Sequence, residues 1–226
     1  MRHMTAILFL CLLVMSAQSG TYIDNFDDGN LDGWEVMDTK NQGVKWTVEN
    51  GVLICNRPSI WDSFLRFGEE EWQNYSIECD AKLVQIFDAF HSMGLDLRLP
   101  KALEKGLSPF VDFSLWDSKT ANISVWLNDV KLNGSSKAFG CQLDHWYRLK
   151  AIASEENFEF YVDGELILSF SDLRASAGCV ALNAGGCLAH FDNVVITGDD
   201  VPDNSSAVSA PNKLAATWGQ IRSQQN

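Results

Sequence analysis

The chain has 226 residues, of which 46% are hydrophobic, enough for a substantial core, and its formal charge is -13. Binding to nucleic acid or to an anionic membrane surface needs clustered Lys and Arg side chains, which this acidic sequence lacks. Both partner classes are therefore excluded, and a neutral partner fits the charge better.

The first residues have the pattern of an export signal. Arg2 and His3 form a short polar start, the apolar run from Ile7 to Met15 is too short to span a bilayer, and Ala17-Gln18-Ser19 offers a small-residue cleavage site. We therefore predict a signal peptide over residues 1–19 and a secreted or extracellular product, periplasmic or at the cell surface if the source is bacterial. A retained membrane anchor is the alternative, but no stop-transfer segment follows.

The middle of the chain reads as a series of short β-strands. Asn50-Gly51 and Asp163-Gly164 each separate two apolar strand patterns, which predicts two tight hairpins of type I′. Further strands are expected at Phe64–Phe67, Ser76–Val84, Met93–Leu99, Phe110–Trp116, Ile123–Leu127, Trp146–Ala153, Cys179–Asn183 and Leu188–Ile196. Short strands at this spacing favour one all-β domain over residues 20–198, built as a two-sheet antiparallel β-sandwich.

Composition changes after Gly198. Residues 199–226 read as a solvated linker and a short C-terminal tail, with a short helix expected over residues 213–222. This tail is predicted either to dock on a protein partner or on its own domain, or to be a disordered end.

Five cysteines remain after removal of the signal, an odd number without zinc-site spacing. Buried, unpaired thiols are expected, because a core of this size needs no disulfide. The five are Cys55, Cys79, Cys141, Cys179 and Cys187.

Three central strands separate into an apolar and a polar face, because successive side chains of a strand point to opposite sides. The core side is expected to carry Leu95, Leu97, Leu99, Val111, Phe113, Leu115, Ile123, Val125 and Leu127. The opposite side is expected to carry Asp96, Arg98, Asp112, Ser114, Trp116, Asn122, Ser124 and Trp126.

This mixture of groups suits a sugar. Indole rings stack on the apolar faces of pyranose rings, and charged or hydroxyl groups bond the sugar hydroxyls. We therefore predict a carbohydrate-binding, lectin-like module in which Trp116 and Trp126 form the stacking platform. Its polar contacts are predicted to be Asp96, Arg98, Asp112, Ser114 and Ser124. The alternative is that loops cover both tryptophans.

The two ends of the domain carry a family resemblance. The opening Asn25-Phe26-Asp27-Asp28-Gly29 and the closing Phe191-Asp192-Asn193-Val194-Val195-Ile196 resemble the concanavalin A-like lectin/glucanase superfamily, in which the first and last strands meet. Together with His145-Trp146-Tyr147-Arg148-Leu149-Lys150, they are also similar to secreted 3-keto-disaccharide hydrolase-like domains. The resemblance implies a jelly-roll sandwich, a fold used by lectins, carbohydrate-binding modules and glycanases alike.

Two other function classes stay open. A glycoside hydrolase would use Asp96 and Asp112 as its carboxylate pair, but two aspartates beside Arg98 are more often an ion-pair cluster. The glucanase signature Glu-x-Asp-x-x-Glu is also missing, so we expect binding rather than turnover. An extracellular protein-interaction module like a laminin-G domain is the third class.

No organic cofactor is expected, but a structural calcium ion is a candidate near the closing strand. Asp192, with Asp24 and Asp27, offers the hard oxygen ligands that Ca²⁺ prefers, and the family resemblance implies an ion there. The alternative is that these acids cap turns and accept from backbone N–H groups.

Overall fold

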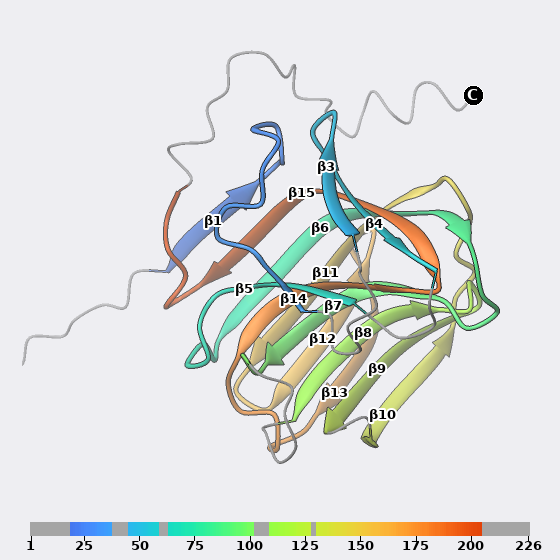
Figure 1. Cartoon of the computed structure of the whole chain (residues 1–226). Coiled ribbons are helices and arrows are strands. Elements are labelled where there is room, and N and C mark those ends of the chain that lie inside the picture. Colours follow the sequence, from blue (N-terminus) through green and yellow to red (C-terminus); the bar gives the residue numbers. More distant parts are fainter. Residues whose placement is uncertain (1–18, 38–44, 59–62, 102–108, 128–129, 205–226) are drawn as a thin grey trace, which may run out of the picture.

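The computed structural model describes residues 19–37, 45–58, 63–101, 109–127 and 130–204, and throughout these ranges it contains strands and turns but no helix (Figure 1). In this part of the chain there is accordingly no helix long and apolar enough to cross a membrane. Residues 1–18 of the predicted signal peptide and the predicted helix over residues 213–222 lie outside the described ranges.

Fifteen described strands form two antiparallel sheets that pack as a β-sandwich, which confirms the predicted fold class. The eight-stranded sheet has the order β13-β12-β11-β6-β15-β4-β3, with β1 also paired to β15. Its strands are β1 (Gly20–Asp24), β3 (Lys45–Glu49), β4 (Val52–Arg57), β6 (Tyr75–Ile86), β11 (Trp146–Ser154), β12 (Asn157–Val162), β13 (Glu165–Ser171) and β15 (Cys187–Gly198).

The seven-stranded sheet has the order β10-β9-β8-β7-β14-β5-β2. Its strands are β2 (Glu35–Met37), β5 (Ser63–Phe67), β7 (Ser92–Leu99), β8 (Phe110–Trp116), β9 (Thr120–Leu127), β10 (Val130–Ala138) and β14 (Cys179–Gly185).

The first and last strands meet, as the family resemblance implies. In the β1–β15 pair Gly20 lies opposite Gly198 and Asp24 lies opposite Val194. The residues after β15 continue along β1, because the Asn204 side chain accepts a hydrogen bond from the backbone N–H of Ile23 (2.7 Å) and donates one to its carbonyl (3.0 Å). Val201 is buried and Asn204 is half-buried against β1, while Asp199, Asp200, Pro202 and Asp203 are exposed.

Both predicted hairpin turns are present. Asn50 and Gly51 have φ of 55° and 73° between β3 and β4, and Asp163 and Gly164 have φ of 52° and 81° between β12 and β13. Type I′ turns need positive φ at both central residues, which Asn, Asp and Gly adopt at least cost. These two dipeptides therefore fix the registers of their hairpins.

The core lies between the sheets and follows the period-two pattern. Val111, Phe113, Ile123 and Val125 are fully buried, and Phe113 packs against Phe160 of the opposite sheet at 5.6 Å between ring centroids. Leu115 is buried as well, and Leu127 is half-buried at the end of β9. The register predicted for β8 and β9 is therefore confirmed.

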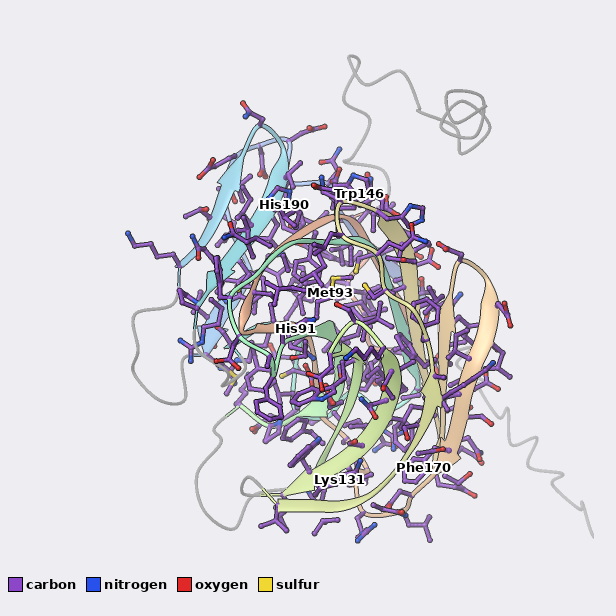
Figure 2. All side chains as sticks on the ribbon, turned by 90° about the vertical axis from the view of Figure 1, so that its right-hand side faces the viewer. His91, Met93, Lys131, Trp146, Phe170 and His190 are labelled. Carbon is purple, nitrogen blue, oxygen red and sulfur yellow. The ribbon has the colours of Figure 1, made fainter. Side chains whose placement is uncertain are left out.

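The two sheets approach each other at their edges as well. The edge strands β10 and β13 are in contact, and Figure 2 labels one residue of each, Lys131 and Phe170. Four of the five cysteines in the described ranges are buried and Cys141 is half-buried, as expected of thiols in a core of this size.

Candidate functional site

The candidate site is the face of the seven-stranded sheet that points away from the core, called here the polar face. Its side chains align in rows across β7, β8 and β9. One row holds Asp96, Asp112 and Ser124, and the next holds Ser114 and Asn122. The rows exist because the three strands run antiparallel without a shift at these positions, so that the polar members of each strand share one side.

The centre of the polar face is a group of two carboxylates and one amide. The side-chain nitrogen of Asn183, on β14, donates to Asp96 Oδ2 at 2.7 Å and to Asp112 Oδ1 at 3.2 Å. The Ser114 hydroxyl donates to the second oxygen of Asp112 at 3.1 Å. We call Asp96, Asp112 and Asn183 the acid–amide centre. Because one amide holds both carboxylates, their positions are fixed relative to each other.

The members of this centre differ in how far they are buried. Asp96 and Asn183 are fully buried, and Ser114 and Ser124 are each only 2% exposed, whereas Asp112 is half-buried. Asp112 is therefore the member of the centre that a ligand can reach. Asp96 and Asn183 lie behind it and orient its carboxylate.

The two tryptophans predicted as one stacking platform lie at opposite ends of the acid–amide centre. Trp126 is opposite Phe110, one row beyond Asp112, while Trp116 is opposite Thr120 at the other end of β8. Six residues of strand separate the two rows, which corresponds to about 20 Å. Both indoles are half-buried, so each offers a partly exposed ring, but a single sugar ring cannot contact both.

The Trp126 end of the polar face continues into an apolar cluster that the sequence did not reveal. Phe64, Leu99 and Ala181 are buried there, and the Phe64 and Phe110 rings meet edge to face at 5.9 Å between centroids. Met37 of β2 packs against the same cluster. The polar face is therefore polar only between this cluster and Trp116.

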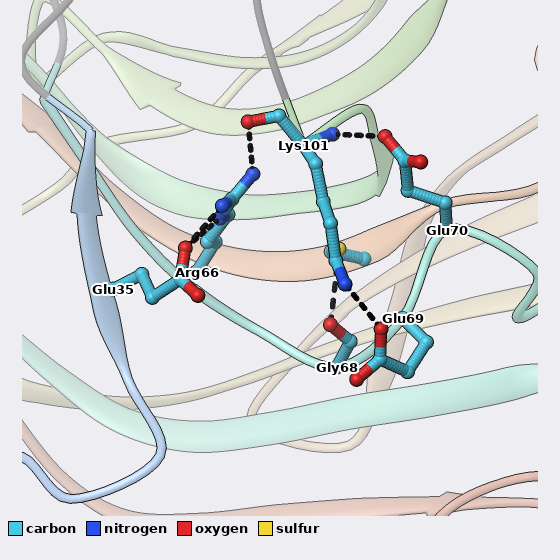
Figure 3. Close-up of polar contacts among 7 residues, drawn as sticks. Glu35, Arg66, Gly68, Glu69, Glu70 and Lys101 are labelled. Atoms are coloured by element: carbon cyan, nitrogen blue, oxygen red, sulfur yellow. Dashed lines mark hydrogen bonds and ion pairs between the residues drawn. The ribbon is translucent and has the colours of Figure 1, made fainter.

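Ion pairs lie beyond the apolar cluster, at the edge formed by β2 and β5 (Figure 3). Arg66 donates to Glu35 and to the carbonyl of Lys101, whose own side chain pairs with Glu69. The Lys101 backbone N–H donates to Glu70 at 2.8 Å. The Arg66 guanidinium holds the pKa of Glu35 below its ordinary value. Surface pairs of this kind add little stability; they link β2 and β5 to Lys101, shortly after the end of β7.

Arg98 does not lie on the polar face, so its predicted role in ligand binding is corrected. A β-bulge at this point of the β7–β14 pair gives Arg98 a φ of 58° and turns its side chain inward. The guanidinium lies over the Phe158 ring at 4.8 Å and donates to backbone carbonyls of Gln73, Ala175 and Glu155. Burial lowers the pKa of Arg98.

The same bulge also moves the side chain of the next residue, Leu99, to the opposite face of the sheet. Leu99 was expected in the core with Leu95 and Leu97, but it lies in the apolar cluster on the polar face. One extra residue on β7 is enough to move Leu99 out of the core, because a one-residue shift exchanges the two faces of a strand.

Asp24, Asp27 and Asp192, the acids predicted to hold calcium, each accept a hydrogen bond from a nearby group. Across the described ranges no group of three or more His, Cys, Asp or Glu side chains is placed to hold an ion. Asp24 accepts hydrogen bonds from Trp34 Nε1 and from the Phe26 backbone N–H, both at 2.8 Å, and burial raises its pKa. Asp27 accepts from the Asn25 side chain, and Asp192 from the Asn193 backbone N–H. These acids fit the alternative role of organising turns.

Comparison with known proteins places this geometry in a family. The family model of the 3-keto-alpha-glucoside-1,2-lyase-like domain matches residues 21–197 of the sequence, which is the whole sandwich except its outermost residues. No curated protein matches the chain.

Solved structures share the fold at low sequence identity. A CBM66 carbohydrate-binding module from Bacillus subtilis superposes with a TM-score of 0.58 at 19% identity, covering 74% of this chain and 96% of that one. A Bacillus licheniformis β-glucanase has a TM-score of 0.58 at 13% identity, covering 79% and 97% of the two chains. The endo-β-1,3(4)-glucanase SCLam also reaches 0.58, at 14% identity, with 83% and 94% covered. At such identities the likeness shows the concanavalin-like fold alone.

Proposed function

Because the chain belongs to the 3-keto-alpha-glucoside-1,2-lyase-like domain family, we propose that it is an exported carbohydrate-binding module that holds a neutral oligosaccharide along its polar face. The observation that carries this proposal is the order of side chains along β8 and β9. Half-buried tryptophans lie at both ends, and a half-buried carboxylate lies between them. Export follows from the signal pattern in residues 1–19.

The spacing along the strands favours a chain of sugars over a single one. Trp116 and Trp126 are separated by about 20 Å along the strands. Each indole has room for one sugar ring, so contact with both needs at least one further ring over Asp112. The proposed ligand is therefore an oligosaccharide that runs along β8 and β9.

The chemistry of the centre favours an uncharged ligand. An ionised carboxylate only accepts hydrogen bonds, and sugar hydroxyls are donors that suit it. Asp96 and Asp112 place two acids in this region, and the whole chain carries a formal charge of -13. Like charges repel an anionic ligand at such a face, whereas a neutral glycan meets no such cost.

The fold of the solved relatives supports the same conclusion. One is described as a carbohydrate-binding module and two as β-glucanases. Mixed-linkage β-glucan fragments are therefore the first probes to test on this chain.

The test is binding of an array of neutral oligosaccharides, followed by calorimetry of the best ligand with wild type and Asp112→Ala. The proposal expects saturable binding that Asp112→Ala weakens at least tenfold, the loss of about one charge-assisted hydrogen bond. Asp32→Ala is a matched control, because Asp32 is exposed and lies in the turn before β2. Absence of binding to any glycan, together with capture of an extracellular protein, would favour the laminin-G-type alternative.

A glycan-cleaving enzyme is the second candidate, favoured by the family description and by the close pair of carboxylates. Asp96 and Asp112 bond to one amide nitrogen, so these two oxygens are closer than the about 6.5–9.5 Å of an inverting glycosidase. A retaining mechanism needs both carboxylates at the sugar, yet Asp96 is fully buried. This burial is why binding is the preferred function.

An assay of turnover separates the two candidates. Oligosaccharides and 3-keto-α-glucosides are incubated with wild type and with Asp112→Asn, and the release of reducing ends or of free sugar is followed. The binding proposal expects no release above that of the variant. Turnover in wild type that disappears in a folded Asp112→Asn protein would establish the enzyme instead.

A further inference from the structure

The turn between β6 and β7 carries an aromatic ring that the proposed site has not yet used. Phe90 is 57% exposed, the most exposed aromatic side chain of the described residues. Its ring lies 6.5 Å from that of Trp116, tilted by 47°. The pair lies at the end of the polar face opposite the apolar cluster. This end of the polar face therefore presents two neighbouring aromatic rings, one exposed and one half-buried.

Backbone hydrogen bonds hold this turn in one conformation. The carbonyl of Gly186, in the turn between β14 and β15, accepts from the backbone N–H groups of Phe87 (2.9 Å) and Asp88 (3.1 Å). The Asp88 carboxylate accepts from the backbone N–H of Phe90 at 2.9 Å. Gly186 has a φ of 63°, and a Cβ there would lie 2.4 Å from the Phe90 carbonyl oxygen. The glycine therefore allows the turn to lie directly against it.

His91, which Figure 2 labels, links this turn to the one that follows Trp116. It is 5% exposed, with Nδ1 at 3.0 Å from the Asp88 carbonyl and Nε2 at 2.7 Å from the Ser118 hydroxyl. A carbonyl only accepts, so Nδ1 donates to Asp88, and Nε2 forms the bond with the Ser118 hydroxyl. The His91 carbonyl also accepts from the backbone N–H of Asp117 at 2.9 Å. Phe90 and Trp116 are thus fixed relative to each other before any ligand arrives.

We propose that Phe90 and Trp116 form a terminal subsite that holds one sugar ring of the oligosaccharide by stacking. This inference rests on the proposed function and extends it to a residue outside the sheet. Trp116 lies four residues from Asp112 on β8, about 13 Å away. The ring held at this subsite is therefore not the ring that bonds to Asp112. A rigid pair of aromatic rings lowers the cost of ordering on binding, which favours its use as a contact.

The subsite predicts a dependence on ligand length. Calorimetry compares wild type and Phe90→Ala with β-glucan fragments from disaccharide to hexasaccharide. Loss of one aromatic contact is expected to weaken binding of the long fragments about 3- to 10-fold, and to leave the shortest fragment that binds unchanged. Phe90→Trp should bind the long fragments as wild type does. Phe90→Leu should lose nearly as much as Phe90→Ala, because stacking needs a flat ring.

Leu173→Ala is the matched control. Leu173 is 81% exposed and lies in the connection between β13 and β14, which joins the end of β14 remote from Gly186. Its replacement is expected to leave the affinity for every fragment unchanged. Full affinity of Phe90→Ala or of Phe90→Leu for the long fragments would overturn the subsite while wild-type binding still supports the proposed function. If wild type binds no glycan, the proposed function itself fails, and the subsite fails with it.

Discussion

Trp116 and Trp126 share one face of the seven-stranded sheet but lie at its two ends, with the row of Asp112 between them. This separation decides how many sugar rings the two tryptophans can contact. A pair of adjacent rings would hold one sugar, whereas two rings about 20 Å apart hold separate sugars of one chain. The polar face is therefore suited to an extended ligand, and the consequences can be measured residue by residue.

The first prediction concerns the two indoles. Trp116→Ala and Trp126→Ala should each weaken oligosaccharide binding by about 1–2 kcal/mol, because each removes one stacking contact. The double variant should show the sum of the two losses, since sites this far apart behave independently. Calorimetry with the best array ligand provides the measurement.

Trp146→Ala is the control for both variants. Trp146 is half-buried like them, but it lies on β11 in the other sheet, beside His190 and under the Lys82 ammonium (Figure 2). Its loss should leave affinity unchanged. A double variant no weaker than either single one would contradict two separate subsites.

The second prediction concerns Asn183, which bridges Asp96 and Asp112. Asn183→Ala removes the shared donor and leaves two carboxylates facing each other, at a cost of about 1–3 kcal/mol in the free energy of unfolding. Asn183→Asp should cost more, because it adds a third carboxylate. Urea titrations of wild type, Asn183→Ala and Asn183→Asp measure the two losses in the free energy of unfolding. Equal stability of Asn183→Asp and wild type would show that the amide is not the donor.

The third prediction separates Arg98 from the ligand site. Arg98→Ala leaves three backbone carbonyls without their donor, so the protein should lose at least about 3 kcal/mol of stability. Arg98→Lys should rescue little, because a single ammonium cannot reproduce the planar fork of donors. At temperatures where the variant is folded, its glycan affinity should match that of wild type. A stable variant with lost affinity would instead place Arg98 at the ligand.

The fourth prediction is a pH dependence. Burial, and next the nearby Lys82 ammonium, hold the pKa of His190 below its ordinary value of 6.5. When the pH falls below 6.5, the unfolded chain therefore takes up a proton at this position that the folded protein does not bind. The stability from His190 is present above that pH and is lost as the pH falls toward the folded pKa.

His190→Gln removes this titration. Urea midpoints measured at pH 7.5 and pH 5.5 should therefore differ less in the variant than in wild type. A larger difference in the variant would show that the sign is reversed and that the folded protein binds the proton more tightly.

Much of the fold could be predicted because local chemistry decided it. Asn50-Gly51 and Asp163-Gly164 adopt the positive φ that their hairpins require, and alternating apolar residues placed β8 and β9 in the right register. Strand β10 was missed because Val130–Ala138 lies at a sheet edge, almost entirely exposed, and carries no apolar alternation. This segment is held as a strand by its antiparallel pairing with β9, which the sequence pattern does not reveal.

The site was harder to predict for a different reason. Asn183 lies on β14, whose seven residues are all buried, so polarity alone did not separate its two faces. The positions of Arg98 and Leu99 depend on a bulge against β14, which is a property of the strand pair and not of β7 alone. Phe90 belongs to a turn, where no period applies. Its place beside Trp116 comes from bonds that its neighbours Phe87, Asp88 and His91 make to Gly186 and Ser118.

The most direct test of an extended glycan site on the polar face is an NMR titration of the indole N–H signals. The sequence has eight tryptophans, and single Trp→Phe variants assign their signals. On addition of a binding hexasaccharide, the signals of Trp116 and Trp126 should both shift, while those of the buried Trp34, Trp46 and Trp72 stay in place. A saturating shift confined to Trp146, or saturation without movement of either Trp116 or Trp126, would contradict the site.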